Sequence, residues 1–106
     1  MIVTHIAREQ ITISSTAKNL DADGSGTLFT AANKSKIRYA DVQVLTNNIR
    51  VTYDGTTAPV KDTTGTIWYA GQVKRVWGMT LIENVLMIRD ADSDAVVVAD
   101  YFGSPQ

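Results

Sequence analysis

The chain has no cysteine among its 106 residues. This absence excludes disulfide bonds, thiolate metal sites and cysteine nucleophiles together. It also suits assembly in a reducing cytoplasm, where disulfides do not persist. No apolar run reaches the roughly 18 residues that a membrane-spanning helix needs, so the sequence predicts none.

Side chains for acid–base catalysis are also scarce. His5 is the only imidazole, and Glu9 and Glu83 are the only glutamates. A Ser–His–carboxylate triad would need His5 oriented by a third group, and glycoside hydrolysis would need a pair of carboxylates. The spacing suggests neither arrangement. We therefore predict that the protein is not an enzyme, with no catalytic residues and no cofactor.

The sequence also has no large excess of positive or negative charge. Ten basic and eleven acidic residues leave a formal net charge of −1. Cations do lie beside aromatic residues, before Tyr39 and between Trp68 and Trp77. Nucleobases can stack on such aromatic side chains. The balanced charge, however, argues against electrostatic binding of nucleic acid or anionic lipid. We predict neither a nucleic acid nor a membrane as partner.

The residues that are present favour strands. Apolar and polar side chains alternate over residues 11–14, 40–44 and 49–53, which is the period of a strand with one face in water. Residues 86–88 and 96–98 are more uniformly apolar, as in strands covered on both faces. Gly-, Asn- and Asp-rich turns recur between these segments. We predict a small antiparallel β-sandwich over residues 11–103, wound as a jelly roll, with a helical turn only around Phe29–Ala32.

The two ends lie outside this predicted domain. Residues 1–10 read as an N-terminal arm, since Ile2, Val3 and Ile6 are strand-prone but no turn joins them to the next strand. An unpaired strand of this kind is a template for the edge of another sheet. We predict that the arm pairs with a neighbouring subunit; the alternative is an edge strand on its own sandwich. Residues 104–106 read as a C-terminal tail.

One segment partly matches a calcium-binding loop. Asp21, Asp23 and Ser25 occupy the first, third and fifth positions of an EF-hand pattern. Ala32 stands where the pattern requires the glutamate that closes the site, and no helices are predicted on either side. A Gly-rich turn with Asp caps explains the same residues, and we favour it. These three side chains are nevertheless the sequence's candidates for a metal.

Three aromatic residues are candidates for contact with another protein. Trp68 and Tyr69 are adjacent in an extended segment, so their rings point to opposite faces of a sheet. A thin sandwich buries one face of each sheet, and one of the two rings should therefore face outward. Together with Trp77 and the arm residues Ile2, Val3 and Ile6, they form the predicted protein interface.

From Ile11 onward the sequence resembles a family of small structural proteins encoded by tailed bacteriophages. The most specific part is the strand and turn Ile49–Thr56, read as Ile-Arg-Val-Thr-Tyr-Asp-Gly-Thr, followed much later by a Tyr101-Phe102 strand. The other shared pieces, in the family's order, are residues 11–17, Gly65, 77–78, 82–85, 88–91 and 98–100. The chain departs from the pattern at Thr57-Ala58-Pro59, and residues 1–10 lie outside it.

The resemblance implies a function without chemistry. Such proteins are β-sandwich components of the virion, and a capsid decoration (cement) protein is the role we predict. It implies assembly in the host cytoplasm, docking on the major capsid protein or another virion protein, and self-association, with a trimer favoured. One alternative is a head–tail or tail adaptor. The other is a carbohydrate-binding sandwich in which Trp68 or Trp77 lies beside Asp62 or Asp90.

Overall fold

The computed structural model describes residues 3–20 and 30–104. In chain order, the elements of this part are β1 (Thr4–Ile13), β2 (Lys18–Asn19), α1 (Ala31–Lys36), β3 (Ile37–Thr46), β4 (Ile49–Thr52), β5 (Thr66–Trp68), β6 (Val73–Trp77), α2 (Met79–Asn84), β7 (Leu86–Arg89) and β8 (Ala95–Gly103).

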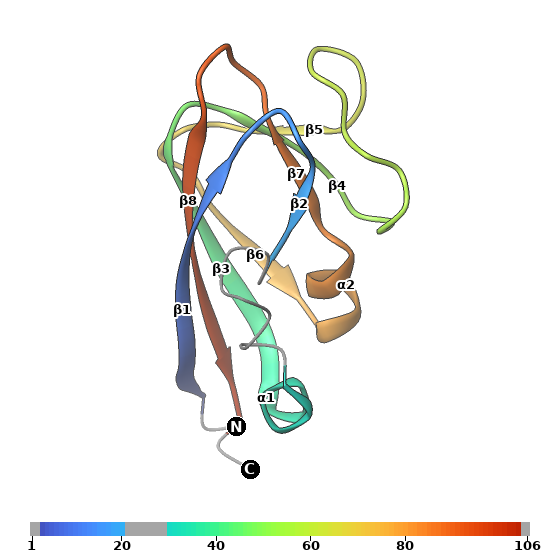
Figure 1. The fold of residues 1–106 in the computed structure, drawn as a ribbon. Coiled ribbons are helices and arrows are strands. Elements are labelled where there is room, and N and C mark those ends of the chain that lie inside the picture. Colours follow the sequence, from blue (N-terminus) through green and yellow to red (C-terminus); the bar gives the residue numbers. More distant parts are fainter. Residues whose placement is uncertain (1–2, 21–29, 105–106) are drawn as a thin grey trace.

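The strands form two four-stranded sheets that pack face to face (Figure 1). Sheet A has the order β1-β8-β3-β6, and sheet B has the order β2-β7-β4-β5. Every neighbouring pair is antiparallel. The structure is therefore a small all-β sandwich, as the alternating sequence pattern predicted.

Strand pairing is nested along the chain. The first described strand pairs with the last, β2 pairs with β7, β3 with β6 and β4 with β5. The additional pairs β3–β8 and β4–β7 join these ladders into the two sheets. Each sheet thus combines strands from both halves of the chain, and few pairs are neighbours in sequence.

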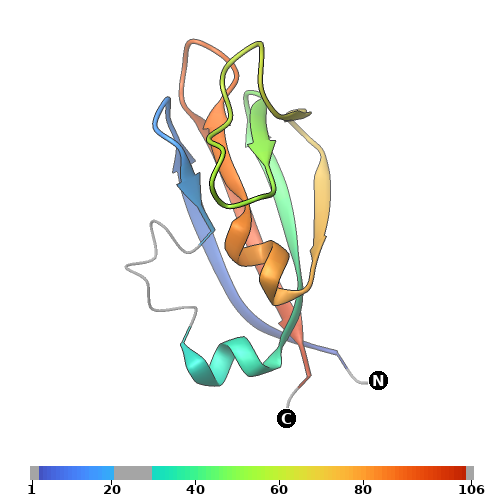
Figure 2. The same ribbon diagram turned by 90° about the vertical axis from the view of Figure 1, so that its right-hand side faces the viewer.

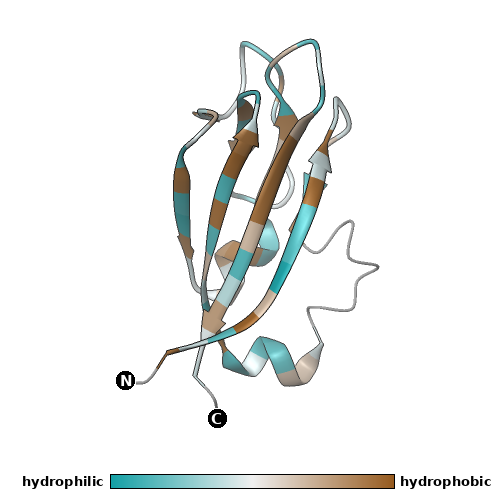
Figure 3. Ribbon diagram, turned by 90° about the vertical axis from the view of Figure 1, so that its left-hand side faces the viewer, coloured by the Kyte–Doolittle hydropathy of each residue, from teal (hydrophilic) through white to brown (hydrophobic). Residues whose placement is uncertain are grey.

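The core lies between the sheets and follows the two-residue period of the strands. In β8 the side chains of Ala95, Val97, Ala99 and Tyr101 are fully buried, whereas the residues between them face outward and are partly exposed. Figure 3 shows the same alternation as bands of colour along β3. Residues 86–88 were expected to be covered on both faces, and Ile88 at the end of this segment is buried, with only 6% of the residue exposed.

Sheet A is longer than sheet B, and a helix covers the difference. β1, β3 and β8 have nine or ten residues, while no strand of sheet B exceeds four. In Figure 2, α2 lies beside sheet B and against the lower part of sheet A. Its Ile82 and the following Val85 are fully buried. The sequence predicted only a turn near the start of α1 and did not predict α2, because such short helices show no periodic pattern.

The predicted arm over residues 1–10 is wrong for its described part. Thr4–Gln10 form the first seven residues of β1 and pair with β8 of the same chain, from Thr4 opposite Gly103 onward. Glu9 faces the interior, where its carboxylate accepts a hydrogen bond from the buried Tyr101 hydroxyl. The domain therefore begins before residue 11. The partner strand lies about a hundred residues away in sequence, so no local turn could indicate it.

The lower end of sheet A closes where β8 meets the end of α1. Thr30 caps α1 by accepting a hydrogen bond from the backbone N–H of Asn33 at 3.2 Å. The Ser104 N–H donates to the Lys36 carbonyl at 3.0 Å, which ties the start of the predicted tail to the body. Gly103 lies so close to this junction that an added Cβ would be 1.9 Å from the Lys36 carbonyl oxygen.

Candidate interaction surface

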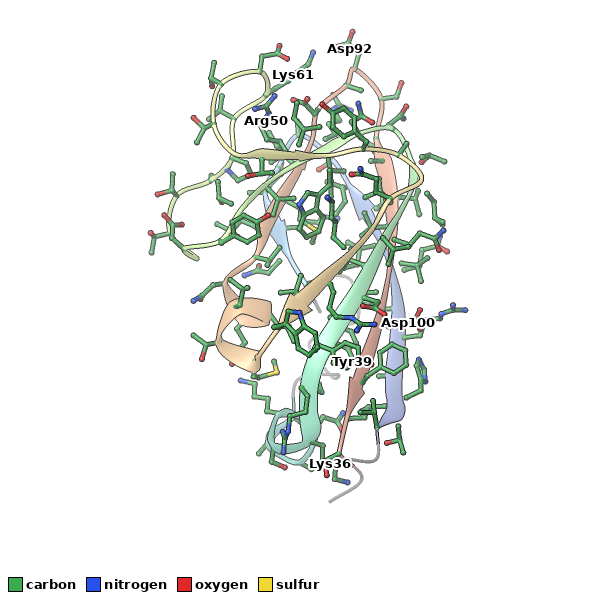
Figure 4. All side chains as sticks on the ribbon, turned by 180° about the vertical axis from the view of Figure 1, so that it is seen from behind. Lys36, Tyr39, Arg50, Lys61, Asp92 and Asp100 are labelled. Atoms are coloured by element: carbon green, nitrogen blue, oxygen red, sulfur yellow. The ribbon has the colours of Figure 1, made fainter. Side chains whose placement is uncertain are left out.

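The outer face of sheet A carries a row of aromatic side chains. His5, Phe102, Tyr39 and Trp77 come from β1, β8, β3 and β6 in that order, and each is in register with the next. Their ring centroids are 5.3, 5.2 and 5.0 Å apart along the row. We call these four residues the aromatic row. It crosses the whole sheet, and Tyr39 marks its place in Figure 4.

Within the aromatic row, the Tyr39 ring is covered on both of its faces. Phe102 stacks on Tyr39 at an interplanar angle of 20°, and the Arg75 guanidinium lies 4.1 Å from the centre of the Tyr39 ring. Phe102 and Arg75 come from the strands on opposite sides of β3, so they cover opposite faces of Tyr39. Trp77 at the end of the row is 62% exposed. The row therefore offers ordered ring edges and one large exposed indole.

Next to the aromatic row runs a row of charged residues. Arg8, Asp100, Asp41 and Arg75 occupy the next outward positions of β1, β8, β3 and β6. Arg8 binds Asp100 at 2.9 Å, and Arg75 binds Asp41 at 2.7 Å. His5 adds a contact of 2.9 Å to Asp100. The charges cancel in pairs, so this face has no excess of one sign.

Protonation of the charged row follows from these contacts. Partial burial disfavours the charged form of Asp100, but hydrogen bonds from Arg8 and His5 outweigh it, and its pKa is lowered. The hydrogen bond to Asp41 raises the pKa of Arg75. Asp100 and Arg75 are therefore charged at neutral pH.

A third row completes the centre of the outer face. Gln10, Val98, Gln43 and Val73 are in register across the same four strands. Val98 is partly buried among its neighbours, and Val73 on the edge strand β6 is 57% exposed. Amide and aliphatic side chains alternate here without charge. The outer face of sheet A thus changes from aromatic through charged to mildly apolar along the strands.

A second site lies at the upper end of the sandwich, marked by Lys61 and Asp92 in Figure 4. An open pocket of about 360 Å³ is lined there by Ser15, Pro59, Val60, Lys61, Ile88, Arg89, Ala91 and Asp92. Its lining combines apolar side chains with ion pairs. Lys61 binds Asp92 at 3.0 Å, and Arg89 binds Asp94 at 2.7 Å.

An enclosed ion pair lies near this pocket. The Arg50 and Asp90 side chains are 11% and 7% exposed and bind each other at 3.0 Å. The Asp62 N–H also donates to Asp90, at 3.2 Å. The hydrogen bond that Arg50 donates to Asp90 lowers the pKa of Asp90 despite its burial, and the same bond raises the pKa of Arg50. This pair ties β4 to the turn after β7.

Acid should therefore destabilise the fold through Asp90. A carboxylate whose pKa is lower in the folded chain stabilises the fold above its ordinary pKa, and this stability is lost as the pH falls through the folded value. We expect the melting temperature to fall once the pH drops below about 5, and to keep falling below the ordinary value of 3.8 towards the lowered folded value, and to fall less steeply in Asp90→Asn. Asp92→Asn is the control, because the Asp92 side chain is 98% exposed. An equal flattening by both variants would contradict the assignment to Asp90.

The structure brings few of the predicted interface residues together. Trp68 is only 3% exposed and donates a hydrogen bond to the Tyr53 hydroxyl, so its prediction as an interface residue is wrong. Tyr69 is 52% exposed, which confirms that the two adjacent rings face opposite ways. Val3 is exposed at the start of the chain, and Ile6 packs partly against the core. Ile2 lies outside the described residues.

Sequence reasoning missed three members of the aromatic row. His5, Tyr39 and Phe102 lie far apart in sequence, and only the strand order brings them side by side. The alternation within β3 and β8 could have placed Tyr39 and Phe102 on outward faces, but it says nothing about which strands are neighbours. Trp77, the fourth member, was predicted as an interface residue, and it is exposed.

The metal candidates Asp21, Asp23 and Ser25 lie outside the described residues. Within residues 3–20 and 30–104, no three histidine, aspartate or glutamate side chains gather as metal ligands. In this same part of the chain, neither helix has the length and apolar character needed to cross a membrane.

No family model, curated protein or solved structure matches the chain.

Proposed function

We propose that this chain is a structural protein of a tailed-bacteriophage virion, and that it decorates and stabilises the capsid. The observation that supports this most is the outer face of sheet A, a broad surface with paired charges, ordered aromatic edges and no excess charge. Such a surface suits contact with another protein. The resemblance of the sequence from Ile11 to Phe102 points to the same class.

We also propose that the sandwich is a jelly roll. Folding one long antiparallel hairpin of eight strands onto itself gives nested pairs and two four-stranded sheets, each mixing strands from both arms of the hairpin. The nested ladders described above and the two strand orders fit this winding. A jelly roll suits a decoration role, because its body is held together by pairs between distant strands.

The carbohydrate-binding alternative has less support. A sugar ring stacks on an open aromatic face, but both faces of Tyr39 are covered by Phe102 and Arg75. The structure also does not assemble the sugar sites that were predicted from the sequence. Trp68 is buried, Asp90 is held by Arg50, and Trp77 packs beside Tyr39 in the lower half of the molecule (Figure 4).

Binding to empty heads tests the proposed function. Heads assembled from the major capsid protein encoded in the same genome would be mixed with the purified chain and sedimented. We expect the chain to cosediment at saturable stoichiometry and to raise the temperature at which the heads disrupt. Val98→Arg, at the centre of the outer face, should weaken binding more than about tenfold, because it would bury an unpaired charge.

Thr66→Arg is the matched control. It introduces the same side chain on the exposed edge strand β5 of sheet B, away from the outer face of sheet A. It should leave binding unchanged. Binding to isolated tails but not to heads would replace decoration by the adaptor role, and binding only to host polysaccharide would overturn the structural role altogether.

A further inference from the structure

The strand β6 has one edge that is bonded to β3 and one open edge. Gln72, just before β6, accepts a backbone hydrogen bond from β3, and Gly78, just after it, donates one to the same strand. Bonded and non-bonded positions alternate in an antiparallel ladder, so Lys74 and Val76 are the bonded positions between these two residues. The backbone groups of residues 73, 75 and 77 therefore point away from β3.

No element of the described chain covers this open edge. Among residues 3–20 and 30–104, the backbone groups of Val73, Arg75 and Trp77 have no hydrogen-bond partner. Figure 2 and Figure 3 show β6 at the margin of the molecule, with no described strand or helix beyond it. The strand has no proline, and no bulge interrupts its pairing with β3. A regular edge of this kind is a template for a strand of another chain.

The other sheet edges are less suited to such pairing. The edge strands β2 and β5 of sheet B have only two and three residues. The edge strand β1 of sheet A is interrupted by a shift of register between His5 and Ala7. Short strands and bulges are common ways of protecting an edge. The five residues of β6 carry neither protection.

Two exposed apolar side chains lie along the open edge on the outer face of sheet A. Val73 is 57% exposed and Trp77 is 62% exposed. Between them, the Arg75 guanidinium is turned toward β3, where it binds Asp41 at 2.7 and 3.0 Å and lies against Tyr39. A strand added to this edge would therefore contact apolar surface on the outer face, beside a charge that is already compensated.

Lys74 lies on the opposite face of β6 and decides which charge a partner strand must carry. It shares the inner face with Val76, which is 2% exposed, and is itself only partly exposed. None of the ion pairs of the described residues includes Lys74. An inward-pointing lysine on an edge strand disfavours pairing with a strand that places an apolar side chain or a cation opposite it. A carboxylate at that position removes the penalty.

We infer that the open edge of β6 binds an extended segment of another protein by strand addition, and that this segment carries a carboxylate flanked by apolar side chains. Added antiparallel, like every strand pair of this fold, the segment hydrogen-bonds to residues 73, 75 and 77. Lys74 then occupies a non-bonded position, where opposite side chains approach most closely. The carboxylate of the segment forms a cross-strand ion pair with it.

A second copy of β6 lacks this chemistry. An antiparallel pairing that joins residues 73, 75 and 77 of two copies places Val76 of one copy opposite Lys74 of the other, and Arg75 opposite Arg75. No carboxylate meets Lys74 in that arrangement. The chemistry of the edge therefore favours a different partner. This inference goes beyond the proposed function and does not depend on it.

Hydrogen exchange of the whole chain tests the inference. In the free protein, the amides of Lys74 and Val76 should be protected, and those of residues 73, 75 and 77 should exchange fast. The probe is a capped peptide with the core Val-Ile-Thr-Glu-Val, whose glutamate lies opposite Lys74 when its first valine lies opposite Trp77. At millimolar concentration it should slow exchange at the three open-edge amides. Fast exchange that the peptide leaves unchanged would overturn strand addition, as would protection of these amides in the free protein.

Exchange of charges tests the role of Lys74. Lys74→Glu should weaken binding of the peptide about tenfold, because it replaces an attractive cross-strand pair by a repulsive one. A peptide with lysine in place of the glutamate should bind this variant more tightly than it binds the wild type. Lys36→Glu makes the same change of charge in α1 and should alter neither affinity. An equal effect of Lys74→Glu on both peptides would overturn the required carboxylate.

Val73→Pro tests the backbone bonds. Proline is tolerated at the first residue of an edge strand, and here it removes an N–H that points away from β3. Circular dichroism should therefore show intact strands, while loss of one hydrogen bond weakens peptide binding about fivefold. Val73→Thr keeps the N–H and is the matched control. Equal binding by the two variants would contradict strand addition, and the exchange pattern of the wild type decides the question if Val73→Pro does not fold.

Two further outcomes are distinguishable. Protection of the open-edge amides that appears without peptide as the protein concentration rises would make a second copy the occupant and overturn the stated chemistry. Head binding by a chain whose open edge takes no peptide would contradict this inference and leave the proposed function standing. Peptide binding by a chain that binds no heads would do the reverse.

Discussion

Trp68→Ala should cost about 3–5 kcal/mol of unfolding free energy, the usual loss when a buried tryptophan is truncated. Trp68 is 3% exposed, packs near Tyr53 at a centroid distance of 6.3 Å and donates a hydrogen bond of 3.2 Å to the Tyr53 hydroxyl. Truncation would leave a cavity between the sheets and remove that bond. Urea denaturation followed by circular dichroism measures the change.

Trp77→Ala is the matched comparison, because it removes the same side chain from the outer face. Trp77 is 62% exposed and contacts mainly Tyr39 and Arg75. Its loss should cost less than about 1.5 kcal/mol, the upper value for an aromatic pair. Equal costs at the two positions would mean that Trp68 and Trp77 are not divided between core and surface as described.

Gly103→Ala should cost about 3 kcal/mol, at the upper end of the range for overpacking a tight site. An added Cβ would lie 1.9 Å from the Lys36 carbonyl oxygen and 2.9 Å from the Cα of Ile37. These are backbone atoms, so no side chain can move aside. The end of β8 would have to separate from the α1–β3 junction, with loss of the Ser104–Lys36 hydrogen bond.

Gly71→Ala distinguishes a steric clash from backbone strain. Gly71 has a φ of 90° and no atom within 4 Å of an added Cβ, so its substitution tests only the left-handed conformation. At Gly103 the backbone is not in the left-handed region, so Gly103→Ala tests only the steric clash of the added Cβ. Hydrogen exchange should show faster opening around Lys36 and Ile37 in Gly103→Ala and no change there in Gly71→Ala. A Gly103→Ala protein as stable as wild type would contradict the close approach.

The strands of this fold are predictable because their alternation is local. Ile49 and Val51 are fully buried, as the two-residue period requires, and the opposite orientation of Trp68 and Tyr69 follows from adjacency alone. Which of the two rings faces the core is not a local property. The hydrogen bond to Tyr53, the residue that follows β4, accompanies the inward position of Trp68.

The partners of the strands are what the sequence could not supply. His5 and Phe102 are a cross-strand pair at opposite ends of the chain, and β3 meets β8 without any connecting turn. A hydrophobic period says which side chains point inward, but strand order depends on packing summed over the whole domain. The aromatic row was hidden for this reason, although each of its residues could be placed on a strand or near one.

The position of β8 also bears on the order of events during synthesis. This strand lies between β1 and β3 in sheet A, yet it is the last of the described strands to leave the ribosome. Until then β1 and β3 have no partner between them, and the side chains of Val97 and Tyr101 that fill the core are missing. Pairs this distant in sequence close slowly. A nascent chain stalled before Ala95 should therefore remain protease-sensitive, and resistance should appear in one step once residues 95–103 have emerged.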